Sequence, residues 1–151
     1  MQNFSDFFPD ELKEQVANSN LKVGSVLRIP VTFTTPPKVK RLIIVGFDNQ
    51  NVALASVLIN SEINPNKFPT QRMKDLHLEL DENSRDYLDH TSYVDCSQIR
   101  EMDVSNIKSM LIDDPAICIG ELDTTDLTNV IDKIKTSHTI ANKIKKKFGF
   151  K

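Results

Sequence analysis

The chain has 151 residues, of which 39% are hydrophobic and 26% are charged, and its formal net charge is −2. This length suits one compact domain with short attachments, and this balance of apolar and charged residues excludes an intrinsically disordered chain. The longest apolar run, residues 42–47, is too short to span a bilayer, and the acidic start of the chain lacks the pattern of a secretory signal. A cytoplasmic protein without membrane contact is therefore expected.

The first predicted element is a short helix within an N-terminal helical arm, residues 1–20. Pro9 suits a first turn, and the acidic residues that follow it complement the helix dipole. After the arm, three segments rich in β-branched residues are separated by the turn signals PP and DNQN, at residues 24–33, 38–48 and 51–60. Connections this short predict neighbouring antiparallel strands.

A long loop and several short strands are predicted next. Residues 60–76 contain two prolines and three asparagines without a clean period, which predicts a loop with at most one helical turn. Residues 76–80 alternate strictly, so we expect a half-buried strand whose His77 faces solvent. Two further strands are predicted at residues 91–96 and 98–102, with a bulge near residue 97.

The last part of the chain is predicted to be mainly helical. A helix ends before Pro115, a short buried strand follows it, and an amphipathic helix begins at Asp123 or Thr124. A short lysine-rich helix with a frayed tip ends at Gly149. The whole order predicts a mainly β, α+β fold, in which a small antiparallel barrel at residues 21–122 is capped by the N-terminal helix and by helices at 123–151.

Lysines and cysteines constrain the chemistry further. Residues 133–151 hold seven lysines and no carboxylate, whereas the first 132 residues have twelve basic against twenty-one acidic residues. This tail is either a solvated extension or a contact for phosphate or an acidic partner. Cys96 and Cys118 lack the spacing of a zinc site, so reduced thiols, no metal and no cofactor are expected.

Three segments in this order resemble the MazF/PemK family of toxin–antitoxin ribonucleases. They are KVGSVLRIPVTF, KVKRLIIVGFD and TSYVDCSQIREMD, followed by a distal IGEL and a helix, and they span residues 22–135. The resemblance implies an SH3-like barrel, cleavage of single-stranded RNA without metal, an antitoxin-like protein partner and a homodimer. It also places Arg41 at the family's arginine, and Asn60 with Ser61 at the strand end beside the active groove.

The sequence departs from the family pattern at places that matter for activity. Leu42 follows Arg41 where the family usually has proline, and TTPPKVK replaces the glycine-rich loop. Asp95 and Ser97 stand where some members have a catalytic arginine and aspartate. The fold tolerates such changes more readily than catalysis does.

Metal-free RNA cleavage requires a base, an acid and a cation that converge on the reacting phosphate. Arg41 is the predicted phosphate ligand, because guanidinium binds phosphate bidentately. Asp95 is the candidate base, unless it serves structure by pairing with Arg100 or with a turn amide. His90 is the candidate proton donor or acceptor at neutral pH, unless it is a solvated turn residue.

The remaining candidate site residues are predicted to bind substrate. Asn60, Ser61, Ser97, Gln98 and Arg100 are expected to line a groove, although hydrogen bonds that satisfy a bulge are the structural alternative.

Three hypotheses follow. The first is a toxin-like endoribonuclease, and the second is a catalytically inactive SH3-barrel module that binds a protein or nucleic-acid strand. The third assigns RNA or acidic-partner binding to the lysine-rich tail. The first requires Arg41, the end of the 51–60 strand and the 92–98 segment to face one concavity.

Overall fold

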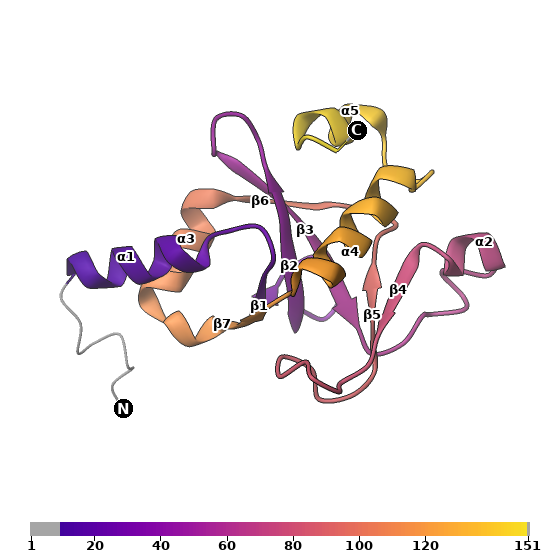
Figure 1. Ribbon diagram of the computed structural model, residues 1–151, viewed down its shortest axis with the longest axis horizontal. Coiled ribbons are helices and arrows are strands. Elements are labelled where there is room, and N and C mark those ends of the chain that lie inside the picture. The colour runs from indigo at the N-terminus through magenta and orange to yellow at the C-terminus, as the bar shows by residue number, and fades with distance from the viewer. Residues whose placement is uncertain (1–9, 151) are drawn as a thin grey trace.

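The structure is a computed structural model that describes residues 10–150. It has an α+β fold, in which an antiparallel sheet curls into a half-barrel and helices cover both of its faces (Figure 1). Pro9, predicted in the first helical turn, lies outside the described residues. No helix within residues 10–150 is long and apolar enough to cross a membrane.

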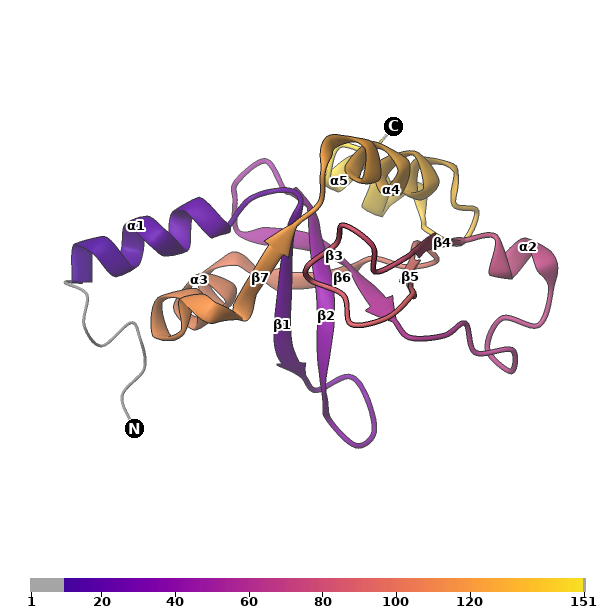
Figure 2. The same cartoon turned by 60° about the horizontal axis from the view of Figure 1, so that its bottom comes forward.

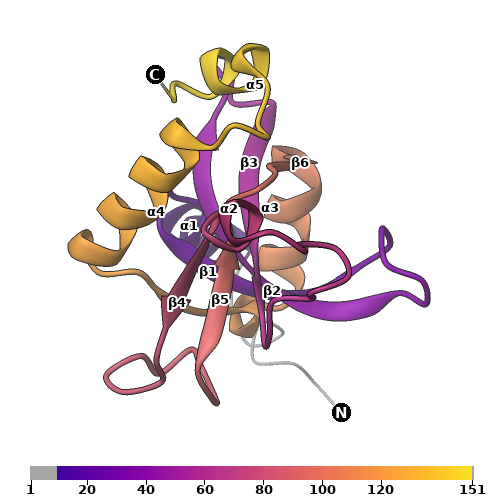
Figure 3. The ribbon, with the colours of Figure 1, turned by 90° about the vertical axis from the view of Figure 1, so that its right-hand side faces the viewer.

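The three predicted neighbouring strands are confirmed as the centre of the sheet. They are β1 (Ser25–Val31), β2 (Lys38–Phe47) and β3 (Ala53–Asn60), and each is antiparallel to the next. The connection between β1 and β2 projects from the body of the molecule (Figures 2 and 3). Both faces of β2 and β3 are largely buried, which their β-branched and aliphatic residues favour.

Three short strands extend the sheet beyond β3. They are β4 (His77–Leu80), β5 (Ser92–Asp95) and β6 (Arg100–Asp103). β5 pairs with the end of β3 and with β4, whereas β6 pairs with the first half of β3. The chain bends between β5 and β6, as the predicted bulge near residue 97 requires, so two strands share one edge of β3.

The last strand and the helices complete the fold. β7 (Cys118–Glu121) pairs with β1, so the sheet order is β4-β5-β3-β2-β1-β7 with β6 beside β3. Asp123 accepts a hydrogen bond from the backbone nitrogen of Asp126, which makes it the N-cap of the amphipathic helix. The helices are α1 (Asp10–Asn20), α2 (Gln71–Lys74), α3 (Val104–Asp113), the 3-10 helix η2 (Pro115–Ile117), α4 (Thr124–Thr136) and α5 (Asn142–Lys147).

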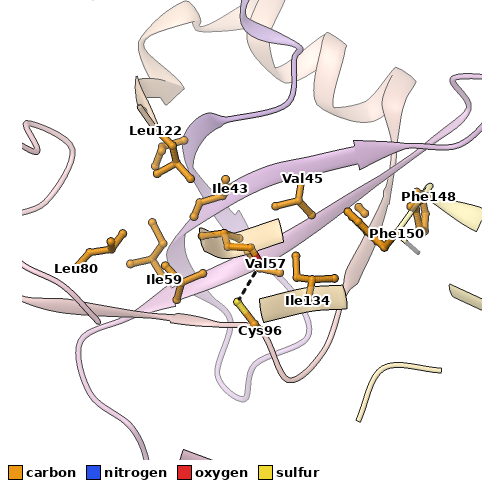
Figure 4. Close-up of a cluster of buried hydrophobic side chains, with 14 of the residues drawn as sticks. Ile43, Val45, Val57, Ile59, Leu80, Cys96, Leu122, Ile134, Phe148 and Phe150 are labelled. Atoms are coloured by element: carbon orange, nitrogen blue, oxygen red, sulfur yellow. Dashed lines mark hydrogen bonds between the residues drawn. The ribbon is translucent and has the colours of Figure 1, made fainter. Parts of the chain in front are cut away.

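Alternate residues of the central strands serve two separate cores. One face, which we call the α4 face, carries Ile43 and Val45 against α4 and includes Cys96, whose Sγ lies 4.0 Å from the carbonyl oxygen of Val130 (Figure 4). The opposite face, which we call the α3 face, carries Leu42 and Ile44 against α1 and α3. Figures 1 and 2 show α1 and α3 on one side of the sheet and α4 and α5 on the other.

The C-terminal tip is packed into the core, contrary to the frayed end predicted from its lysines. Phe148 and Phe150 are only 6% and 4% exposed, and both belong to the buried cluster of the α4 face (Figure 4). A Cβ atom on Gly46 would lie 3.2 Å from the Phe150 ring. The two aromatic side chains supply the apolar area that a lysine-rich helix lacks, and they fix α5 on the sheet.

Candidate nucleic-acid interface

A groove on the α3 face gathers cationic, polar and aromatic side chains where β2 begins and β3 ends. The β1–β2 connection, the loop after β3 and the β5–β6 segment also contribute to it. We call this region the basic groove, and its main lining residues are Phe33, Lys38, Lys40, Asn60, Ser61, Glu62, Lys67, Phe68, Asp95 and Arg100. Asn60, Ser61, Asp95 and Arg100, all predicted site residues, are thus brought together.

Lys40 is the central cation of the basic groove. Its Nζ donates a hydrogen bond to Oδ1 of Asn60 at 2.9 Å, across neighbouring strands. Partial burial lowers the pKa of Lys40, and the positive charges of Lys38 and Lys67 lower it further. Three lysines therefore repel one another across this groove, and an anion bound between them would relieve that repulsion.

Arg100 is held at the edge of the basic groove by two neighbours. Its guanidinium lies over the Phe33 ring, 4.1 Å from the ring centroid. With the oxygen of the Gln98 amide turned toward Arg100, that oxygen accepts hydrogen bonds from Nε at 2.7 Å and from Nη2 at 2.6 Å. Gln98, predicted to line the groove, instead contacts Arg100 and holds its guanidinium in place.

Asp95 lines the basic groove but is only 4% exposed. Its Oδ1 accepts hydrogen bonds from the backbone nitrogen of Ser97, at 2.9 Å, and from the Ser97 hydroxyl. This is the turn-amide pairing that the sequence left open, rather than an ion pair with Arg100. The Ser97 hydroxyl is directed at Asp95, so the prediction that it contacts substrate does not fit its geometry.

His77 was missed as a neighbour of this site because strict alternation predicted that it faces solvent. Its side chain is only 1% exposed, and its Nε2 lies 3.6 Å from Oδ1 of Asp95. The Phe68 ring packs edge-on against the imidazole with the centroids 4.3 Å apart, and Nδ1 lies 3.2 Å from the carbonyl oxygen of Lys74. The loop between β3 and β4 folds back over this face and buries the histidine.

Arg41 and His90 lie outside the basic groove, so the predicted common concavity does not form around Arg41. Arg41 is cross-strand to Ile59 on the α4 face, and its Nη2 pairs with Oδ2 of Asp89 at 2.9 Å. His90 lies in the turn before β5, where its Nδ1 is 3.0 Å from the carbonyl oxygen of Thr91. Because neighbouring residues of a strand point to opposite faces, Lys40 occupies the position expected for Arg41.

The residues that sequence reasoning missed are three lysines and two aromatic side chains of the groove. The K-V-K alternation at the start of β2 was the available signal, since it puts Lys38 and Lys40 on one face. No such signal marked Phe33, Lys67 or Phe68, which lie in connections between elements.

Comparison of the sequence with protein-family models gives no match, and comparison with curated proteins gives none either. Among residues 10–150, no group of three or more histidine, cysteine, aspartate or glutamate side chains could hold a metal ion. Cys96 and Cys118 are both free thiols. The groove presents two cations that are held by neighbours, Lys40 by Asn60 and Arg100 by Phe33 and Gln98, and cations of this kind bind anions.

Proposed function

We propose that the protein is a MazF/PemK-like module, with an SH3-like barrel, that binds single-stranded RNA in the basic groove. One observation carries the proposal: Lys38, Lys40, Lys67 and Arg100 converge on one groove, where they outnumber the carboxylates of Glu62 and Asp95. Four cations at one site favour the phosphate backbone of a nucleic acid as the ligand. The curled antiparallel sheet, with three consecutive neighbouring strands, supports the barrel assignment.

An exposed aromatic side chain favours a single strand over a duplex. Phe33 lines the groove and is 39% exposed, and unpaired bases stack on exposed aromatic rings whereas paired bases do not expose their faces. Asn60 and Ser61 add polar groups that contact base edges or the 2′-hydroxyl. A homodimer and an antitoxin-like protein partner belong to the same proposal, on the strength of the family resemblance.

Endoribonuclease activity is the second candidate function, and the position of Asp95 favours it. Asp95 lines the groove beside cations, and the mechanism assigns it the proton of a 2′-hydroxyl, which requires bound RNA to displace the Ser97 hydroxyl from the buried carboxylate. The lowered pKa of Lys40 makes it a better proton donor to the leaving 5′-oxygen than an ordinary lysine. Arg100 neutralises the charge of the phosphorane. This mechanism uses neither Arg41 nor His90.

Fluorescence anisotropy with a labelled, mixed-sequence single-stranded RNA tests the binding proposal. Each phosphate contact contributes about 0.7 to the slope of log affinity against log salt, so Lys40→Ala should flatten that slope by about 0.7. Lys22→Ala is the matched control, because Lys22 is exposed and pairs with Glu121 away from the groove. Unchanged affinity and slope in Lys40→Ala would reject the groove as the RNA site.

Gel analysis of the same RNA, incubated without metal, separates the two candidate functions. Intact RNA with normal binding supports the binding module alone. Cleavage that disappears in Asp95→Asn but persists in Arg41→Ala supports the ribonuclease. Cleavage that is lost in Arg41→Ala with unchanged RNA affinity contradicts a mechanism that relies on Asp95, Lys40 and Arg100.

A further inference from the structure

A second cationic region lies at the other end of the β2–β3 hairpin, at the turn that joins the two strands. Figure 3 shows α5, which carries most of its lysines, beside this end of the hairpin. We call it the lysine surface, and it consists of Lys135, Lys143, Lys145, Lys146 and Lys147. We propose that the lysine surface is a separate binding site for the phosphate backbone of nucleic acid. It shares no residue with the basic groove, so this inference does not depend on the proposed function.

Two hollows flank α5 and join into one surface. The first lies between α5 and the β2–β3 turn and is lined by Asp48, Asn49, Gln50, Lys143, Lys146 and Lys147. The second lies between α5 and the end of α4 and includes Lys135, Lys145 and Lys146. Because Lys146 lines both hollows, a bound chain can pass across α5 from one to the other.

The lysines are carried by a fixed element rather than by a free tail. Phe148 and Phe150 anchor the end of α5 in the core. Lys145 Nζ donates hydrogen bonds to the carbonyl oxygens of Lys135, at 2.9 Å, and Ser137, at 2.8 Å, which ties α5 to the end of α4. A fixed array of cations loses less conformational entropy on binding than a flexible tail does.

The positive charge of this surface is only partly balanced. Among the described residues that line the two hollows, Asp48 is the only carboxylate, and its Oδ1 already accepts a hydrogen bond from the backbone nitrogen of Val52 at 2.9 Å. Glu101 pairs with Lys147 from the neighbouring strand. Within the part of the chain that the structure describes, Lys143 and Lys146 have no ion pair, so these two lysines are the best placed to bind an external anion.

The surroundings favour nucleic acid over an anionic membrane. A helix that lies on a membrane exposes an apolar face, whereas the aromatic residues beside the α5 lysines, Phe148 and Phe150, are buried. The rims of the two hollows instead carry the amide side chains of Asn49, Gln50 and Asn142, which donate hydrogen bonds to phosphate and sugar oxygens. Contacts of this kind position a backbone and carry no sequence preference.

The two cationic sites are too far apart to act as one pocket. Lys40 and Asp48 are eight residues apart along β2 and its end, which corresponds to about 26 Å at a strand rise of about 3.3 Å per residue. A ligand held by the lysine surface alone therefore does not have to enter the basic groove. Duplexes, which cannot splay their bases over Phe33, are suitable probes for the second site.

The test compares the full-length protein with the double variant Lys143→Glu/Lys146→Glu. Labelled duplex DNA, duplex RNA and single-stranded RNA are titrated over a range of sodium chloride concentrations. Losing two phosphate contacts should flatten the salt slope for duplex DNA by about 1.8 and weaken binding at low salt at least tenfold. Equal losses of affinity for duplex DNA and duplex RNA identify the shared phosphate backbone as the ligand. A loss of affinity for only one of the two duplexes contradicts recognition of the phosphate backbone alone.

Two control variants separate charge from folding. Lys143→Arg/Lys146→Arg should keep duplex affinity within twofold, and Lys22→Ala, which removes an exposed lysine outside both cationic sites, should leave duplex binding unchanged. Duplex affinity and slope that do not change in the Glu variant, with circular dichroism showing an intact fold, would overturn the proposal. Binding to phosphatidylserine vesicles that is lost in this variant, without any loss of nucleic-acid binding, would overturn it in favour of a membrane.

Discussion

Replacing Phe150 with alanine tests whether the C-terminal tip is part of the folded core. Phe150 is 4% exposed, and its backbone nitrogen donates to the carbonyl oxygen of Lys145 at 2.6 Å. A buried phenylalanine covers about 200 Å² of apolar surface, which at about 25 cal/mol per Å² corresponds to about 5 kcal/mol. The end of a chain can relax after truncation, so we expect Phe150→Ala to lower the free energy of unfolding by about 3 kcal/mol.

Urea unfolding followed by circular dichroism measures this loss directly. For a chain of this size, about 3 kcal/mol should also lower the melting temperature by about 6 to 12 °C. Phe33→Ala is the matched control, because Phe33 is 39% exposed and its truncation should cost less than about 1 kcal/mol. A loss below about 1 kcal/mol in Phe150→Ala would refute the docking of the tip and, with it, the fixed lysine surface.

Three further predictions concern the core and the α4 face. Arg85 donates two hydrogen bonds at 2.9 Å to the buried Asp126 carboxylate, so Asp126→Asn should lower the free energy of unfolding by about 2 kcal/mol in urea titrations. A loss below about 0.5 kcal/mol would contradict the pairing. Burial, and secondarily the charge of a neighbouring carboxylate, raises the pKa of the Cys96 thiol to about 12. Iodoacetamide at neutral pH should therefore label Cys118 in the folded protein and Cys96 only after unfolding, and peptide mass spectrometry measures both reactions. The Arg41 guanidinium lies on the face opposite the basic groove, so Arg41→Ala should change affinity for single-stranded RNA less than twofold in anisotropy titrations. A tenfold loss of affinity would show that RNA reaches the α4 face.

The elements themselves could be predicted from local sequence, because their signals are short-range. β-branched runs between turn residues predicted β1, β2 and β3, and the apolar spacing with an aspartate cap predicted α4. The break near Ser97 was readable for the same reason. Caps, turns and periodicity act over a few residues, so no knowledge of distant contacts was needed.

The K-V-K alternation places Lys38 and Lys40 on one face of β2, but the sequence does not disclose which face lines the basic groove. Residues 42–46 are buried on both faces, so the alternation that normally distinguishes core from surface is absent there. Without it, Arg41 and Lys40 were equally suitable for the groove. A shift of one residue reverses the face, and the pairing of β2 with β3 settled the choice in favour of Lys40.

The sequence by itself determined an α+β chain with closely connected antiparallel strands, a helical C-terminal part and a concentration of lysines at its end. Tertiary structure alone decided that the 60–76 loop buries His77, that Phe148 and Phe150 anchor the tail, and that Lys38, Lys40, Lys67 and Arg100 meet in one groove. The reason is distance along the chain. Each of these outcomes joins segments far apart in sequence, and their burial follows from how the whole sheet curls rather than from any local preference.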